Sequence, residues 1–138
     1  FMSPQHFERV YWKPYAKMLD ALIDMGVTPF IYTEGKYNSR LDQMAEWLPA
    51  GKCIVHFEDV DMKRAKETVG KNSCITGNLP IYMMENGTPE EVINYTKWLI
   101  DTCAPGGGYM FDFDGCLESA KKENMDALWE TVYTYGAK

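Results

Sequence analysis

The sequence predicts an α/β domain in which helices cover a parallel β-sheet. Apolar, β-rich segments alternate strictly with segments of helical period, in units of about 30 residues. One helical segment comes first, and four such βα units follow it. Strict alternation with almost continuously apolar strands is typical of parallel strands buried under helices. A length of 138 residues favours one domain over two.

The first helix is predicted to begin after Ser3 and to end at Gly26. Ser3 is a favourable N-cap residue, Pro4 suits the first helical position, and apolar residues recur behind them at helical spacing. Pro14 lies inside this helix and predicts a kink or a break, because proline lacks the backbone N–H that the helix needs. The apolar residues 27–34 then predict the first buried strand.

The remaining elements repeat the pattern. The expected strands are residues 52–58, 73–78 and 109–114, and the expected helices are residues 38–48, 62–70, 89–103 and 123–135. Asn38 and Asp61 are the N-cap residues expected for the first two of these helices. Thr88 followed by Glu91 is a capping-box sequence for the third. The glycines at 106–108 are expected to turn the chain, since a phosphate-binding loop would follow a strand and precede a helix.

Two architectures fit this order of elements. One is a small doubly wound sheet, and the other is half of a (β/α)8 barrel. An intact barrel needs about 250 residues. On the second interpretation, therefore, the chain holds the later half of the barrel and the N-terminal half lies outside it.

Composition excludes several classes of protein. The chain carries 14 Lys and Arg residues against 20 Asp and Glu, a formal net charge of -6, which argues against a nucleic-acid or anionic-membrane partner. No apolar run approaches the roughly 20 residues needed to span a bilayer. The four cysteines show no Cys-x-x-Cys spacing, so free thiols in a reducing cytoplasm are expected rather than a zinc ribbon or disulfides.

Polar side chains are expected at the carboxyl end of every strand. Because side chains alternate along a strand, every second residue shares a face. The residues on one such face are Tyr32 and Glu34, His56 and Glu58, Thr76 and Asn78, and Asp112 and Asp114. In α/β folds the chemistry is located at this end of the strands. Several carboxylates that face one mouth repel one another, so they need a cation, a shared proton or a basic substrate.

Each of these residues also has a structural interpretation. A single acidic residue at a strand end is most often a helix cap or a solvated loop residue, as expected for Asp59 and Asp61. A lone histidine such as His56 is more often a hydrogen-bonded core residue than a metal ligand. It is the convergence of all four strand ends that indicates a site.

Several motifs together resemble the second half of the uroporphyrinogen decarboxylase superfamily. They are Val60-Asp61-Met62-Lys63-Arg64-Ala65-Lys66, Gly77-Asn78-Leu79, Thr88-Pro89-Glu90-Glu91-Val92, Gly107-Gly108-Tyr109-Met110-Phe111 and Glu123-Asn124-Met125-Asp126-Ala127-Leu128. The resemblance covers essentially the whole chain. It implies a (β/α)8 barrel, with residues 1–138 as a single C-terminal fragment that holds the last four units.

The resemblance implies first a uroporphyrinogen decarboxylase-like protein, a carboxy-lyase of tetrapyrrole biosynthesis that needs no cofactor. In such an enzyme Asp112 or Asp114 would stabilise a protonated pyrrole intermediate. Tyr32 would hydrogen-bond a substrate carboxylate. Thr76 and Asn78 would bind the substrate.

The superfamily also contains zinc methyltransferases, which pass a methyl group from a corrinoid to a thiol such as coenzyme M. Where these carry His-x-Cys-Gly, this chain has Tyr32-Thr33-Glu34-Gly35. The alternative is therefore a corrinoid-dependent methyltransferase with an altered metal site, in which tyrosine and glutamate replace the soft ligands. The ligands expected for zinc or a harder divalent ion are Glu34, His56, Glu58 and Cys116, and a corrinoid is the expected partner.

The half-barrel interpretation also predicts how the isolated chain behaves. Half of a barrel lacks half of the loops that form the mouth, so residues 1–138 alone are expected to be inactive on the small-molecule substrate. The open edges of the sheet expose unpaired backbone groups and apolar surface. Self-association, for instance as a dimer, is therefore expected.

Overall fold

The computed structural model describes residues 2–137, so the first and last residues of the predicted unit 1–138 lie outside the described residues. Within this range four parallel strands form one sheet in the order β1-β2-β3-β4. Their bounds are Phe30–Lys36, Ile54–Asp59, Cys74–Thr76 and Tyr109–Met110. The predicted α/β class and the parallel direction of the strands are confirmed.

Helices precede, separate and follow the strands. In the described part of the chain the α-helices are α1 (Pro4–His6), α2 (Lys13–Asp24), α3 (Leu41–Trp47), α4 (Met62–Glu67), α5 (Ile81–Asn86), α6 (Pro89–Cys103) and α7 (Lys122–Tyr135). A π-helical segment, Phe7–Trp12, joins α1 to α2, and single 3₁₀ turns occupy Asn38–Arg40 and Val69–Lys71. Among residues 2–137 no helix has both the length and the apolar character needed to cross a membrane.

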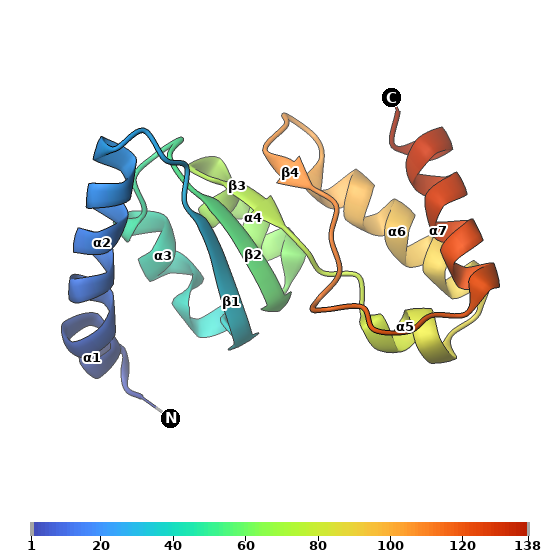
Figure 1. Cartoon of the computed structure of the whole chain (residues 1–138), viewed down its shortest axis with the longest axis horizontal. Helices are drawn as coiled ribbons and strands as arrows, with labels where there is room; N and C mark the ends of the chain where they lie inside the picture. Colours follow the sequence, from blue (N-terminus) through green and yellow to red (C-terminus); the bar gives the residue numbers. More distant parts are fainter. Residues whose placement is uncertain (1, 138) are drawn as a thin grey trace.

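The strand order decides between the two predicted architectures. In a doubly wound sheet the order reverses near the middle, which places helices on both faces. Here each strand lies beside the next one in the sequence, and right-handed crossovers then place every connecting helix on the same face. Figure 1 shows α3 and α4 behind the sheet, with no helix in front of β1 and β2. The structure is therefore half of a barrel.

The two faces of the sheet differ in burial. On the face that packs against the helices, Val55 and Phe57 are fully buried. The opposite face carries Phe30, Tyr32, His56, Thr76 and Met110, and it is named here the uncovered face. Phe30 and Tyr32 expose 48% and 46% of their surface on it, although both are large and apolar in part. In a closed barrel this face lines the interior.

Pro14 does not interrupt the first helix. The helical conformation is continuous from Pro4 to Asp24, and Pro14 lies in the first turn of α2. Immediately before it, the Lys13 N–H bonds to the Glu8 carbonyl, five residues back. This wider π-helical turn rearranges the backbone hydrogen bonds next to a residue that lacks an N–H, so no break is needed.

The predicted helix caps are confirmed in three of four cases. The Ser3 side chain accepts a hydrogen bond from the His6 N–H at the start of α1. The Asp61 carboxylate accepts hydrogen bonds from the Lys63 and Arg64 N–H groups, at 3.0 and 3.2 Å. Thr88 forms the complete capping box at the start of α6. Asn38 was wrongly expected to cap the second helix. Its side-chain oxygen instead accepts from the Asp61 N–H at 2.8 Å, because the chain around Asp61 lies beside it in the fold.

The last predicted strand is much shorter than expected. β4 ends at Met110, and residues 112–114 pair instead with Leu79, through the Leu79 N–H to the Asp112 carbonyl (3.0 Å) and the Asp114 N–H to the Leu79 carbonyl (2.9 Å). Helix α5 occupies a segment that the sequence did not predict to be helical. The segment that carries Asp112 and Asp114 is therefore attached to the chain just before α5.

Candidate functional site

Three of the predicted site residues form one row across the uncovered face. Strand register places Tyr32 beside His56 and His56 beside Thr76. The Tyr32 and His56 rings are stacked, with centroids 3.9 Å apart and planes within 6° of parallel. This stack covers the imidazole, so His56 is fully buried although it lies on the uncovered face.

The row reaches Asp112 through the third strand. The Thr76 hydroxyl donates to Asp112 Oδ2 at 3.1 Å, and the other carboxylate oxygen accepts from the Phe113 N–H at 2.9 Å. His56 Nε2 lies 3.8 Å from Asp112 Oδ2 and 2.8 Å from the Phe113 carbonyl oxygen. The imidazole therefore donates to the carbonyl and lies within electrostatic range of the carboxylate.

Four of the remaining predicted residues, Glu34, Glu58, Asp114 and Cys116, gather around a hollow at the carboxyl ends of the strands. The hollow has a volume of about 210 Å³ and is lined by Tyr32, Glu34, Glu58, Asp114, Gly115 and Cys116. Glu58 is held there because its carboxylate accepts a hydrogen bond from the Gly35 N–H. Gly35 has a φ of 84°, and the β1–β2 register is irregular beside it. Glycine adopts this conformation without strain, and the resulting bulge turns the N–H towards Glu58.

The surroundings of Asp114 change its proton affinity. Partial burial raises the pKa of Asp114, and the nearby Glu58 carboxylate raises it further. The hydrogen bond from the Ile81 N–H to Asp114 Oδ1, at 3.0 Å, acts in the opposite direction. Burial also raises the pKa of the Tyr32 hydroxyl, with a smaller contribution from the Cys116 thiol. Both groups hold their protons more tightly than in water.

Asn78 lies away from the hollow. Its amide donates to the carbonyl oxygens of Glu58 and Val60, at 3.1 and 3.3 Å, and the Tyr95 hydroxyl donates to its Oδ1 at 3.3 Å. Asn78 is 7% exposed. Its contacts hold the end of β2, which carries Glu58, and its role in substrate binding stays a prediction, as does that of Thr76.

The donor atoms present do not fit a metal site formed by this part of the chain alone. Within residues 2–137 no group of three or more His, Cys, Asp or Glu side chains is placed to hold one ion. His56 donates from Nε2 to a carbonyl, and its Nδ1 is buried. Neither ring nitrogen is therefore available to an ion in the hollow. A ligand role for Glu34, Glu58 and Cys116 stays a prediction.

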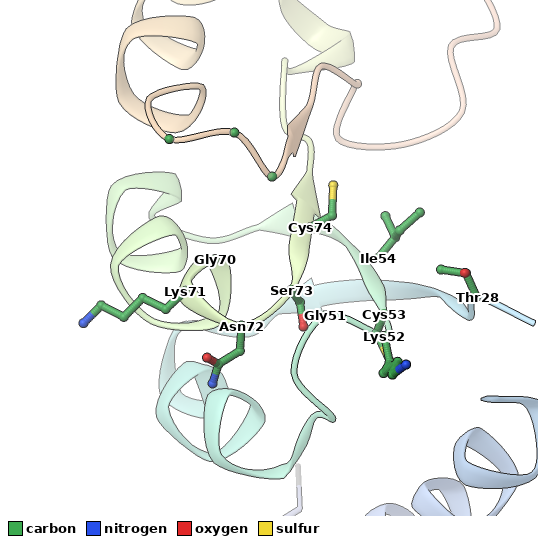
Figure 2. A pocket seen from close by; sticks show the side chains of 13 residues that line it. Thr28, Gly51, Lys52, Cys53, Ile54, Gly70, Lys71, Asn72, Ser73 and Cys74 are labelled. Atoms are coloured by element: carbon green, nitrogen blue, oxygen red, sulfur yellow. The ribbon is translucent and has the colours of Figure 1, made fainter. Parts of the chain in front are cut away.

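A larger pocket lies at the other end of the sheet. It has a volume of about 460 Å³, and it is lined mainly by the segments around Gly51, Ser73 and Gly107. Figure 2 shows the Lys71 side chain extending away from the strands. None of the predicted site residues lines this pocket, which opens at the amino ends of the strands, where barrel enzymes do not place their chemistry.

Sequence reasoning missed the groups that connect the two halves of the site. The Phe113 carbonyl and the Ile81 N–H are backbone groups, and no residue type marks them in a sequence. Gly115 lines the hollow without a side chain. The sequence did show Gly35 directly after Glu34, which is a sign of an irregular strand end.

A match to a family model indicates the family of the chain. The family model described as uroporphyrinogen decarboxylase (URO-D) matches residues 1–135. A curated relative, the methylcobamide:CoM methyltransferase MtbA of Methanosarcina acetivorans, is 28% identical over 131 residues, which are 94% of this chain and 37% of that protein. The chain thus spans well under half the length of this relative.

A solved structure shares the fold. The methyltransferase from Methanosarcina mazei superposes with a TM-score of 0.75 over 99% of this chain and 39% of its own chain, at 18% identity. At that identity the likeness concerns the fold alone. The family match over nearly all of the chain carries the assignment, and the resemblance that the sequence motifs indicate is confirmed. The chain belongs to the uroporphyrinogen decarboxylase (URO-D) family.

Proposed function

We propose that the protein containing this chain is a corrinoid-dependent methyltransferase whose site differs from that of the thiol-methylating relatives. A curated relative whose match covers 94% of the chain is a methylcobamide:CoM methyltransferase. The soft ligands of the zinc methyltransferases are replaced by Tyr32 and Glu34. The reaction we propose therefore depends on acid–base chemistry by the chain's own residues. We also propose a cytoplasmic location, which free thiols favour.

The charge of the hollow is the observation that carries this proposal. Three carboxylates, from Glu34, Glu58 and Asp114, line it, and no lysine or arginine is among its described lining residues. A substrate with many carboxylates would be repelled there, because like charges in a partly buried site raise each other's free energy. A neutral or cationic methyl donor or acceptor is compatible with this lining.

Asp114 is the group we assign to proton transfer. When a methyl group leaves a heteroatom for the corrinoid, the heteroatom keeps the bonding electron pair and takes up a proton. Burial raises the pKa of Asp114, which favours its protonated form, and the carboxyl group lines the hollow. In the reverse direction the same carboxylate accepts the proton. Tyr32 contributes an exposed ring face against which the substrate packs.

A decarboxylase acting on a tetrapyrrole is the second candidate. Decarboxylation leaves a carbon atom that must be protonated, and a carboxyl group with a raised pKa is a suitable donor. No cofactor is required in this case. The acidic lining is the feature against it, because uroporphyrinogen carries several carboxylates.

The experiment compares both reactions in the full-length protein. Cob(I)alamin is mixed with a panel of methylated amines, methyl ethers and methyl thioethers, and methylcobalamin formation is followed by absorbance. Uroporphyrinogen decarboxylation is measured in parallel by chromatography of the oxidised products. We expect methyl transfer, with kcat about 100-fold lower in Asp114→Asn. Asp24→Asn, an exposed carboxylate on α2, is the matched control and should leave kcat unchanged.

Two outcomes would contradict the proposal. Porphyrinogen decarboxylation without methyl transfer would establish the second candidate. A stoichiometric divalent metal found by elemental analysis, and lost in Glu34→Ala, would show that the altered site is a metal site after all and that the acid–base assignment is wrong.

A further inference from the structure

We propose that His56 is a positioning residue, which holds Tyr32 and the segment of Asp112 and Asp114 in place at the hollow. The sequence favours a hydrogen-bonded core residue over a metal ligand at this position, and the burial and the hydrogen bond of His56 fit the core residue. His56 is fully buried on the face of the sheet that the helices leave uncovered. It contacts both sides of the hollow without lining it.

The first contact fixes the ring of Tyr32. The stacking distance of 3.9 Å and the 6° angle leave the two rings in parallel contact. Tyr32 is on β1, an edge strand of the sheet, and 46% of its surface is exposed. An exposed aromatic side chain samples more than one rotamer unless a neighbour restricts it. The imidazole provides that restriction on the side away from solvent.

The second contact fixes the segment that carries the two aspartates. His56 Nε2 donates to the Phe113 carbonyl at 2.8 Å, across 57 residues of sequence. Phe113 lies between Asp112 and Asp114, and β4 has already ended at Met110. Regular strand pairing therefore does not hold this segment. The hydrogen bond from His56 and the two bonds to Leu79 take its place at the backbone, beside the bonds that the Asp112 and Asp114 carboxylates accept from Thr76 and from the Ile81 N–H.

The unpaired nitrogen of His56 supports a role beyond packing. A carbonyl only accepts hydrogen bonds, so Nε2 carries the hydrogen and Nδ1 is a bare acceptor. Nδ1 is buried and has no hydrogen-bond partner in the structure. A buried polar atom without a partner costs stability, and an apolar ring would fill the same space without that cost. The Nε2 donor is the property that an apolar ring lacks.

The test uses three variants of the full-length protein. His56→Phe keeps a planar ring for stacking and removes the donor. His56→Gln restores an amide N–H near the position of Nε2. His6→Phe makes the same substitution at an exposed histidine of α1 and serves as the control. Hydrogen–deuterium exchange is measured for peptides covering residues 111–117, and kcat and KM are measured for methyl transfer.

We expect His56→Phe to speed exchange at residues 111–117 by about tenfold, with little change elsewhere, and to lower kcat by about 10- to 100-fold at a nearly constant KM. His56→Gln should restore both towards wild type, and His6→Phe should change neither. Unchanged exchange at residues 111–117 in His56→Phe would overturn the proposal. So would equally faster exchange across the whole domain in both His56 variants, which indicates general packing.

The kinetic half of this inference rests on the proposed function, and the exchange half does not. If the wild type transfers no methyl group while exchange responds as expected, the proposed function fails and the positioning role of His56 stands. If methyl transfer occurs and exchange at residues 111–117 does not respond, the proposed function stands and the positioning role of His56 fails.

Discussion

Single residues on the uncovered face differ in how firmly their partners hold them. Asp112 receives hydrogen bonds at both carboxylate oxygens, and Thr76 and His56 are buried beside it. Asp114 receives one from a backbone N–H and otherwise faces the hollow. Two carboxylates separated by one residue thus have different surroundings. The catalytic roles of Asp112 and Asp114 stay predictions, and these surroundings favour Asp114 over Asp112 as the group that exchanges a proton.

This difference predicts a pH dependence of stability that originates at Asp114. Burial raises the pKa of Asp114 above its ordinary value of 3.8. As the pH rises, the carboxyl group therefore ionises first in the unfolded chain, and the folded state loses relative stability until the folded pKa is passed. Asp114→Asn removes this loss, while its side-chain oxygen can still accept from Ile81. The free energy of unfolding of Asp114→Asn relative to wild type should therefore rise between pH 4 and pH 8 in urea titrations. A constant difference over that range would contradict the assignment.

At the scale of elements, local signals explain where α6 begins but not where β4 ends. Thr88 and Glu91 form a capping box from residues three apart, so the sequence contains all that the helix start requires. β4 ends after two residues because β3, its pairing partner, also ends early, at Thr76. Strand length is thus decided by a neighbour far away in the sequence.

The cap predicts a measurable effect on stability. Thr88→Ala removes the hydroxyl that accepts from the Glu91 N–H at 3.3 Å, and it should lower the free energy of unfolding by about 1 kcal/mol in urea titrations. The hydrogen bonds from Thr88 lower the pKa of Glu91, so the stabilisation is present at neutral pH and is lost as the pH falls through that lowered pKa. Thr134→Ala, an exposed threonine inside α7, is the control, for which we expect less than about 0.5 kcal/mol. An equal loss of unfolding free energy in both variants would show that the Thr88 cap contributes no more than an exposed threonine inside a helix.

At the scale of the molecule, the half barrel leaves one face of its sheet without a layer to cover it. β1 and β4 are the edge strands of the sheet, and Phe30, Tyr32 and Met110 are each nearly half exposed on the uncovered face. Domains are normally built from two layers around a common core. The helices form one such layer here, and the other side of the sheet has none within the described residues.

We therefore propose that the isolated 138-residue chain self-associates through the uncovered face and the sheet edges. Size-exclusion chromatography with light scattering at low micromolar concentration should give a dimer or larger species. Phe30→Lys introduces a charge on the uncovered face and should shift the population towards monomer. A clean wild-type monomer under these conditions would contradict the prediction.

Local patterns in the sequence determined the α/β class, the parallel strands, most helix bounds and the family motifs, because periodicity, caps and turns act between residues that are close in the chain. They also indicated that Glu34, Glu58 and Asp114 would converge, since parallel strands end at one edge. Only the tertiary structure decided which side chains face the hollow. It also stacked the His56 ring on Tyr32 and formed the hydrogen bond from His56 to the Phe113 carbonyl. The sequence could not show this hydrogen bond, because it joins residues 57 apart and uses a backbone carbonyl that no residue type reveals.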